Sequence, residues 1–284
     1  NFLPKFNIKV KFVDITNLAE VKRAVTKKTK VIYCETISNP LLEVADIPKL
    51  SKIAKASNAK LVVDNTFSPM IVSPARLGAD VVIHSMTKYI NGTSDCVAGC
   101  ICSTHDFISK LNDVNSGASM LLGTVLDSTR AASILKNLHS LHLRLQKHSV
   151  NAMYMATQFR KLGIKTYYPG FKTHKGHKTL LSMMNPGFGF GGIVAIDLLD
   201  EVKANSLMEM MQLEKVGYLA VSLGYFKTLF SSPSHSTSSE IPEDEQKKIG
   251  LGKGLIRFSF GLDNNIPETF GRIKKCMKKL NIIK

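Results

Sequence analysis

The chain contains no tryptophan and only five cysteines among its 284 residues. The cysteine spacing matches none of the zinc-binding patterns, which place cysteines and histidines at short, regular intervals. Cys96, Cys100 and Cys102 lie in or beside an apolar segment and are expected to be small core residues. A small, odd number of cysteines argues against a disulfide framework, so we expect reduced thiols, a cytoplasmic location and no bound metal.

Long apolar segments are also absent, because none approaches the ~18 residues that a membrane-spanning helix needs. Acidic residues are scarce beside basic ones, 22 against 38, which leaves a formal net charge of +16. Such a charge can attract nucleic acid, anionic membranes or anionic small molecules. The lysines are dispersed and no aromatic-interleaved basic motif occurs. We therefore expect a solvated basic surface without nucleic-acid or membrane partners, and a nucleic-acid binder is the weaker alternative.

Three short apolar segments, at residues 31–34, 61–63 and 81–83, have the β-branched composition of buried strands. Each runs directly into polar side chains. In an open α/β sheet, ligands bind beyond the carboxyl ends of the strands, so these side chains are predicted to meet in one crevice. The groups concerned are Glu35 and Asn39 after the first strand, Asp64 after the second, and Ser85, Thr87 and Lys88 after the third.

Two basic residues in this arrangement indicate chemistry. A lysine where a buried strand emerges can form an imine with an aldehyde cofactor, although Lys88 could also simply reach solvent. Arg257 lies in the middle of a predicted strand at 255–260, on the same face as Leu255 and Ser259. Its planar guanidinium suits a carboxylate ligand, and a structural ion pair is the alternative.

The order of strands and helices predicts a mainly parallel, doubly wound sheet. Asp46 and Pro48 mark the start of a helix whose apolar face contains Leu50 and Ile53. Residues 129–162 read as one long helix, ended by Gly163, that bridges into a second domain. We place the domains at 1–150 and 151–284. Further expected elements are strands at 6–14, 97–103, 193–197 and 219–224, helices at 17–27, 106–114, 202–211 and 267–280, and a polar flexible loop at 231–239.

Two other features carry weaker signals. His174 and His177 have a spacing that could bind metal, but no acidic or cysteine partner lies nearby in the sequence. The glycine-rich segment 187–192 resembles a phosphate loop in composition and not in spacing. We interpret it as the entry to the strand at 193–197.

Taken together, the chain resembles the pyridoxal-phosphate enzymes of cysteine and methionine metabolism over nearly its whole length. The matching motifs are residues 35–40 (ETISNP), 62–67 (VVDNTF), 84–89 (HSMTKY), 220–224 (AVSLG) and 255–257 (LIR). Segments 121–123, 168–170 and 236–240 are most similar to the methionine γ-lyases of plants. The resemblance implies the fold of type I pyridoxal-phosphate transferases, which is aspartate aminotransferase-like. Its mainly parallel sheet has helices on both faces, and a smaller α+β C-terminal domain follows.

The resemblance also implies pyridoxal 5'-phosphate as the cofactor. Lys88 would bind it covalently and transfer protons during the reaction. Asp64 would pair with the pyridine nitrogen and keep the ring an electron sink. Asn39 would bond the ring hydroxyl, and Thr66 would lie beside the ring.

Anionic groups have their own predicted partners in this resemblance. Ser85 and Thr87 would bind the cofactor phosphate, and Arg257, helped by Ser222, would bind the substrate carboxylate. The implied reaction is the α,γ-elimination of L-methionine to methanethiol, 2-oxobutanoate and ammonia by a homodimer or homotetramer. A cystathionine γ- or β-lyase and a non-catalytic relative remain as alternatives.

The chain also departs from the family pattern. It begins at Asn1 without methionine or a signal-peptide pattern, so we expect an internal start. The resemblance implies that about a third of the family chain precedes it, including tyrosines that contact the ring and the phosphate. Thr93 stands where a histidine is common. We therefore expect weak or absent turnover from these 284 residues alone.

Overall fold

The computed structural model describes residues 2–235, 246 and 249–284. A four-stranded sheet occupies the N-terminal half, in the order β1-β2-β3-β4. The first three strands are parallel and the fourth is antiparallel to β3. The mainly parallel sheet predicted for this half is thus confirmed. Its strands are β1 Val31–Glu35, β2 Lys60–Asp64, β3 Val81–Ser85 and β4 Gly99–Cys102.

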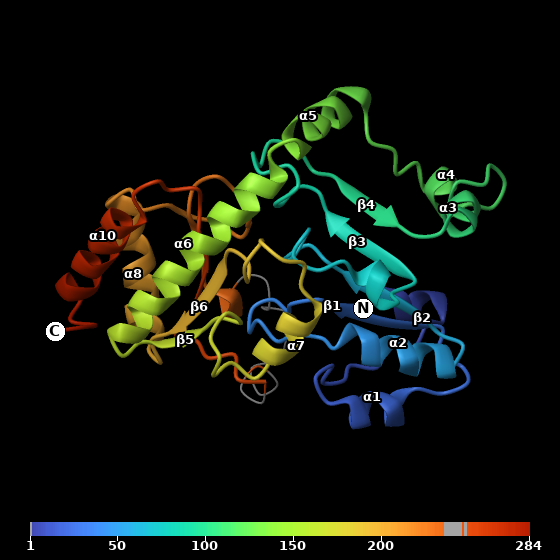
Figure 1. Cartoon of the computed structure of the whole chain (residues 1–284), viewed down its shortest axis with the longest axis horizontal. Helices are drawn as coiled ribbons and strands as arrows, with labels where there is room; N and C mark the ends of the chain where they lie inside the picture. The colour runs from blue at the N-terminus through green and yellow to red at the C-terminus, as the bar shows by residue number, and fades with distance from the viewer. Residues whose placement is uncertain (1, 236–245, 247–248) are drawn as a thin grey trace.

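A second, five-stranded sheet lies in the C-terminal half, in the order β5-β6-β9-β8-β7 (Figure 1). Only the β7–β8 pair is parallel. The sheet is covered by α6, α8 and α10, whose apolar residues share one core with it. Its strands are β5 Lys165–Tyr167, β6 Ile193–Asp197, β7 Tyr218–Leu219, β8 Leu229–Ser231 and β9 Leu255–Ser259.

Helices connect and cover the two sheets, and none of those described is long and apolar enough to cross a membrane. Helix α2 begins as predicted, because the Asp46 carboxylate accepts the backbone N–H of Lys49. The helices are α1 Leu18–Ala24, α2 Ile47–Ala56, α3 His105–Leu111, α4 Ala118–Leu122, α5 Ser128–Leu138, α6 Leu141–Lys161, α7 His177–Met183, α8 Glu201–Leu213 and α10 Ile266–Lys279. Short 3-10 helices cover Leu3–Phe6, Pro74–Leu77 and Pro233–His235.

Helix α6 belongs to both halves of the molecule. Its first turns pack Leu141 and Leu145 into the core of the first sheet. Its later turns pack Met155 and Phe159 into the core of the second sheet. A boundary between 150 and 151 falls inside this helix and stays a prediction.

The two faces of the first sheet differ in burial. In β1, Ile32 and Cys34 are buried, whereas Val31 and Tyr33 are 52% and 55% exposed. In the parallel register Tyr33 pairs with Val62 and lies on the same face. Helices were expected on both faces, but the β1 side of this second face is partly open to solvent in this chain.

Four element predictions were wrong. Residues 6–14 form no strand, since Phe12 is 93% exposed and the alternating segment has no sheet partner. The predicted long helix at 129–162 is interrupted at His139 and Ser140. The strand at 219–224 ends at Leu219. In the predicted flexible loop, residues 231–235 form the end of β8 and a 3-10 turn.

The remaining part of that loop, residues 236–239, and the motif at 236–240 lie outside the described residues. Among the cysteines, Cys34, Cys96 and Cys276 are buried and all five thiols are free. The prediction that Cys102 is a core residue was wrong, because β4 is an edge strand and Cys102 is exposed there. Gly163 ends α6 as predicted, with a positive φ of 77°.

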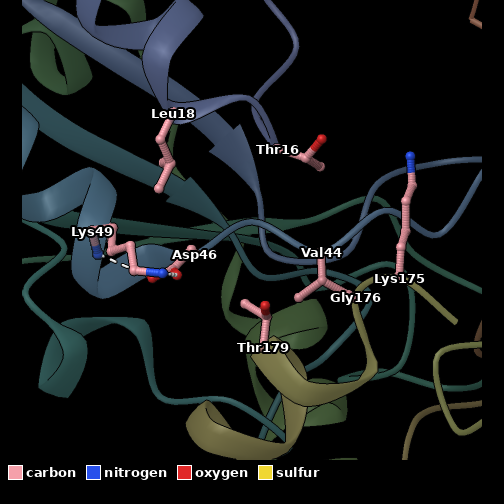
Figure 2. Close-up of a pocket in the computed structure, with 8 residues that line it drawn as sticks. All are labelled: Thr16, Leu18, Val44, Asp46, Lys49, Lys175, Gly176 and Thr179. Atoms are coloured by element: carbon pink, nitrogen blue, oxygen red, sulfur yellow. Dashed lines mark hydrogen bonds and ion pairs between the residues drawn. The ribbon is translucent and has the colours of Figure 1, made fainter. Parts of the chain in front are cut away.

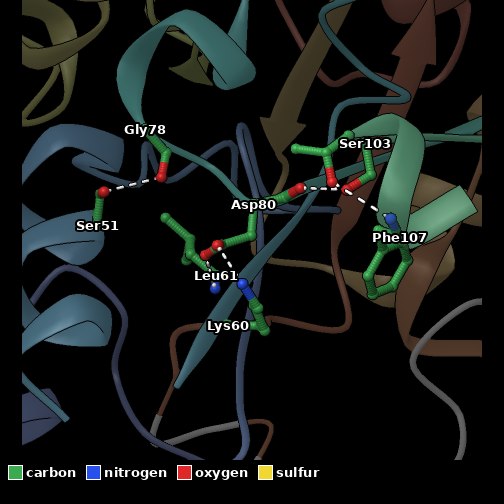
Figure 3. Close-up of polar contacts among 8 residues, drawn as sticks. Ser51, Lys60, Leu61, Gly78, Asp80, Ser103 and Phe107 are labelled. Atoms are coloured by element: carbon green, nitrogen blue, oxygen red, sulfur yellow. Dashed lines mark hydrogen bonds and ion pairs between the residues drawn. The ribbon is translucent and has the colours of Figure 1, made fainter. Parts of the chain in front are cut away.

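Polar contacts fix the start of β3, the strand that leads to Lys88 (Figure 3). The Asp80 carboxylate accepts the N–H of Leu61 at 2.8 Å and the Lys60 ammonium at 3.0 Å. Burial alone would raise the pKa of Asp80, but these two donors lower it. The Ser103 hydroxyl donates to the Asp80 carbonyl at 2.7 Å, which ties the end of β4 to the same point.

His148 is the most buried titratable group of α6, with no exposed surface. Its Nδ1 lies 2.6 Å from the Phe260 carbonyl. A carbonyl can only accept, so Nδ1 carries the proton and Nε2, which has no partner among the described residues, is bare. Burial lowers the pKa of His148 to about 4, because a second proton would leave an uncompensated charge in the core.

We expect stability to fall between pH 6.5 and about 4. In this interval the unfolded chain binds a proton on His148 that the folded chain does not, so the free energy of unfolding decreases as the pH falls. The loss has an upper limit of about 3 kcal/mol. Urea unfolding at several pH values would measure it.

The matched variants are His148→Asn, which can still donate to a carbonyl and does not titrate, and His142→Asn at an exposed position of the same helix. The pH dependence should become shallower only in the first. Equal slopes in all three proteins would contradict the assignment.

Candidate active site

Lys88 lies in the turn that follows β3. Its N–H donates to the Ser85 carbonyl at 3.3 Å and its carbonyl accepts the N–H of Gly92 at 2.8 Å. The ammonium Nζ donates to Ser222 Oγ at 3.1 Å. Burial and then the nearby Arg257 lower the pKa of Lys88. The amine is therefore more often unprotonated, and more nucleophilic, than a surface lysine.

Arg257 is only 1% exposed, in the middle of β9. Its Nη1 donates to Asn39 Oδ1 and its Nη2 to the Ser222 carbonyl, both at 3.0 Å. These acceptors are neutral, and the buried Nε has no partner among the described residues. Burial lowers the pKa of Arg257. A buried guanidinium with a spare donor suits a carboxylate ligand better than the structural ion pair that was its alternative.

Asn39 is held in place from β1. Its N–H donates to Glu35 Oε2 at 2.8 Å. Burial raises the pKa of Glu35 and the nearby Asp64 adds to this, while the bond from Asn39 opposes it. Glu35 and Asp64 lie opposite one another in the β1–β2 register. Glu35 is thus next to both Asn39, through this bond, and Asp64, through the strand register.

Asp64 has donors on both carboxylate oxygens. Oδ1 accepts the N–H of Thr66 at 2.9 Å, and Oδ2 accepts the Tyr33 hydroxyl at 3.2 Å. The Thr66 hydroxyl in turn accepts the N–H of Ser85 at 2.8 Å. These contacts fix the plane of the carboxylate and tie the end of β2 to the end of β3, three residues before Lys88.

The Thr87 hydroxyl already has local partners. It accepts the N–H of Ala98 at 2.9 Å and lies 3.3 Å from the Ala98 carbonyl, to which it donates. A hydroxyl has one proton to donate, so a phosphate at Thr87 would have to take over this bond. The predicted phosphate role of Ser85 and Thr87 stays a prediction.

The structure joins the predicted residues in two hydrogen-bonded groups. Lys88, Ser222, Arg257 and Asn39 form the first group, and Asp64, Thr66 and Ser85 form the second. The Glu35–Asp64 register and the turn between Ser85 and Lys88 connect the groups.

Two contributors to this site were not found from the sequence. Tyr33 follows the period-2 pattern of β1 onto the face of Glu35, a signal that could have indicated its contact with Asp64. Gly224 has a positive φ of 73°, and a Cβ there would lie 2.5 Å from the backbone nitrogen of Tyr89. The Ser222 loop therefore packs directly against the residue that follows Lys88.

Two cavities lie away from the residues described above. A cavity of about 300 Å³ is lined by Asp46, Lys49 and Lys175, with Lys49 paired to Asp46 (Figure 2). Another, of about 410 Å³, includes His174 and Tyr167. Neither contains Lys88, Asp64 or Arg257.

The predicted histidine pair is engaged in other contacts. His174 Nδ1 accepts the N–H of Gly176, and His177 Nδ1 lies 2.8 Å from the Pro169 carbonyl. Within the described part of the chain, no group of three or more histidine, cysteine or acidic residues could hold a metal ion.

Solved structures match the fold of nearly the whole chain. A cystathionine γ-lyase from Lactobacillus plantarum, solved with L-serine, superposes with a TM-score of 0.88 at 29% identity over 99% of this chain and 72% of that one. The fold is therefore that of type I pyridoxal-phosphate enzymes, as the resemblance implied.

The family model for Cys/Met metabolism PLP-dependent enzymes matches residues 1–267, so the chain belongs to this family. A methionine γ-lyase from Arabidopsis thaliana is 40% identical over 99% of the chain. A cystathionine β-lyase from Lactococcus lactis is 37% identical over 98% of it. The chain spans 64% of the length of the first relative and 71% of the second.

Replacing Arg257 with methionine should raise the pKa of Lys88, because a nearby buried positive charge is removed while an unbranched apolar stem is kept. The measurement is the pH dependence of Lys88 acetylation by acetic anhydride, followed by peptide mass spectrometry. Arg160→Met, at an exposed position, is the control. An unchanged Lys88 midpoint in Arg257→Met would show that the two groups are not coupled.

Proposed function

We propose that the chain provides the catalytic lysine and the carboxylate-binding residues of a pyridoxal-phosphate-dependent carbon–sulfur lyase. The observation that supports this most directly is the role of Ser222, whose hydroxyl accepts from Lys88 and whose carbonyl accepts from Arg257. An amino acid carries an amine and a carboxylate on one carbon. A reactive lysine and a guanidinium that share one neighbour match that geometry.

The residues present fit the cofactor. Pyridoxal phosphate needs an amine of lowered pKa, an acid for its ring nitrogen and donors for its oxygens. Lys88 has the first property, and Asp64, fixed by two donors, would supply the second. The side-chain amide oxygen of Asn39 accepts a hydrogen bond from Arg257. The NH₂ group of the same amide is therefore the donor that would bond the ring oxygen. Thr66 would lie beside the ring, and Ser85 and Thr87 would bind the phosphate.

Each residue would have a distinct task in the reaction. Arg257 and Ser222 would bind the substrate carboxylate and so orient the Cα–H bond toward Lys88. Lys88 would remove the Cα proton and transfer protons between the carbon atoms of the substrate side chain. Bound pyridoxal phosphate would supply the electron sink for the charge left at Cα.

L-Methionine is the substrate that we propose. With one water, α,γ-elimination would convert it to methanethiol, 2-oxobutanoate and ammonia. The support is the methionine γ-lyase relative, at 40% identity. A cystathionine lyase is the second candidate, because a cystathionine β-lyase is 37% identical over a similar length. A cytoplasmic location and a homodimeric or homotetrameric assembly are parts of the same proposal.

Lys88→Ala should abolish the visible absorption band that appears when pyridoxal phosphate is added, because the amine that binds the aldehyde is removed. Spectrophotometric titration measures this, with Lys110→Ala, on the surface at α3, as the control. A band of equal strength in Lys88→Ala would contradict the cofactor assignment.

The 2-oxo acid released from L-methionine and from cystathionine would then separate the substrates. The γ-elimination of either compound gives 2-oxobutanoate, whereas the β-elimination of cystathionine gives pyruvate. A lysine-dependent band without release from either would favour the non-catalytic relative.

A further inference from the structure

Helix α6 runs from the α5 junction, beside the first sheet, across the second sheet (Figure 1). Three of its polar side chains, those of Arg144, His148 and Asn151, bond to backbone carbonyls far away in the sequence. They stand at positions i, i+4 and i+7, so they share one face of the helix. The carbonyls that they contact belong to two segments, one after Lys88 and one after Arg257.

The first of these side chains holds the segment after Lys88. Arg144 Nη1 donates to the Tyr89 carbonyl at 2.6 Å, and Nη2 donates to the carbonyls of Ile90 and Asn137 at 3.0 and 3.1 Å. Its Nε donates to the Ser140 hydroxyl at 3.0 Å. Burial lowers the pKa of Arg144. Partial burial costs this cation hydration, and its acceptors are neutral. The bonds that replace the hydration hold the backbone at Tyr89 and Ile90 in place.

The turn after Lys88 is shaped to accept this guanidinium. Gly92 has a positive φ of 77°, and a Cβ there would lie 2.4 Å from Arg144 Nη1. The Asn137 amide donates to Asn91 Oδ1 at 2.8 Å, which adds a second link from the α5 end to the same turn. The Lys88 turn is therefore bonded to the α5–α6 junction at three consecutive residues, 89–91.

The other two side chains hold the segment after β9. Asn151 Nδ2 donates to the carbonyls of Gly261 and Asp263 at 2.8 and 3.0 Å, and it is fully buried. His148 Nδ1 donates to the Phe260 carbonyl. The His148 ring also packs edge-on against Tyr89, with centroids 5.2 Å apart. The end of the strand that carries Arg257 is thus anchored to the same helix face as the Lys88 turn.

We propose that Arg144 and Asn151 are positioning residues that use α6 as a rigid spacer between Lys88 and Arg257. An α-helix rises 1.5 Å per residue, so the separation of the two anchors is set by the step of seven residues from Arg144 to Asn151. Arg144 fixes the amine end of the site and Asn151 fixes the carboxylate end. The inference rests on the proposed function, because only that function supplies one substrate that reaches both Lys88 and Arg257.

The two anchors should affect two different measurements on the chain loaded with pyridoxal phosphate. Arg144→Gln should weaken cofactor binding about tenfold, read from the Lys88-dependent band, because bonds from a charged donor to the turn are lost. Its relative affinity for L-methionine over L-methioninamide, which lacks the carboxylate, should stay within about twofold.

Asn151→Ala should show the opposite pattern. The preference for L-methionine over L-methioninamide should fall about tenfold, because the strand end that carries Arg257 is released, while cofactor affinity is nearly unchanged. Gln146→Ala, at an exposed position of the same helix, is the control and should change neither. A purely structural role predicts instead that both quantities fall together with the melting temperature.

The outcomes are distinguishable from failure of the proposed function. No Lys88-dependent band in the unmodified chain would overturn that function and this inference with it. A band in the unmodified chain, with both variants unchanged or both altered in parallel, would overturn the spacer role alone. If Arg144→Gln does not fold, Ser140→Ala removes the hydroxyl that accepts from Nε and donates to the Asn137 carbonyl, and it should reproduce the cofactor effect in weaker form.

Discussion

The site depends on two cationic side chains held close together in partly dry surroundings. Lys88 and Arg257 both contact Ser222, and Arg257 lowers the pKa of Lys88. Like charges repel more strongly as water is removed, so this arrangement needs rigid support and favours neutral amine at Lys88. The hydroxyl and carbonyl of Ser222 and the amide oxygen of Asn39 satisfy donors without neutralising the charge. A substrate carboxylate would provide that neutralisation, which makes its binding at Arg257 favourable.

Support for this pair comes from three separate parts of the chain. The parallel strands β1 to β3 end together and place Asn39, Asp64 and Lys88 at one edge of the first sheet. The second sheet contributes Arg257 from β9, and the loop after β7 contributes Ser222. Helix α6 packs into both cores, so it links one sheet to the other. Precise placement of reacting groups is worth large factors in rate, and it requires such rigid connections.

Local patterns in the sequence predicted much of this architecture. Apolar runs ending in polar residues identified β1 to β3, and the period-2 alternation of β9 placed Arg257 and Ser259 on one buried face. The break in the helical region at Ser140 could not be predicted in this way, because no glycine or proline marks it. Arg144 bonds both to this break, at Ser140 and Asn137, and to the Tyr89 and Ile90 carbonyls, which lie more than fifty residues away. Contacts of that range are decided by tertiary packing and leave no periodic signal.

The segment after β7 is a second case in which tertiary contacts decide the structure, because a strand was predicted there and is absent. Its β-branched and apolar residues predicted a strand through residue 224, but pairing stops at Leu219. Beyond it, the Ser222 hydroxyl and carbonyl bond to Lys88 and Arg257, and the Gly224 N–H donates to Ser259 Oγ at 2.9 Å. These contacts use groups that a continued strand would direct elsewhere. Tertiary hydrogen bonds have overridden the local propensity that favoured a strand.

The roles proposed for the site residues do not distinguish one sulfur amino acid from another. Arg257, Ser222 and Asn39 would recognise a carboxylate, and Lys88 and Asp64 would serve the chemistry at Cα. All sulfur amino acids share these groups. Their side chains differ only from Cβ outward, and none of the contacts that join these residues reaches that far. These residues would therefore serve methionine and cystathionine alike, in keeping with the similar identities of 40% and 37% to lyases named for the two substrates.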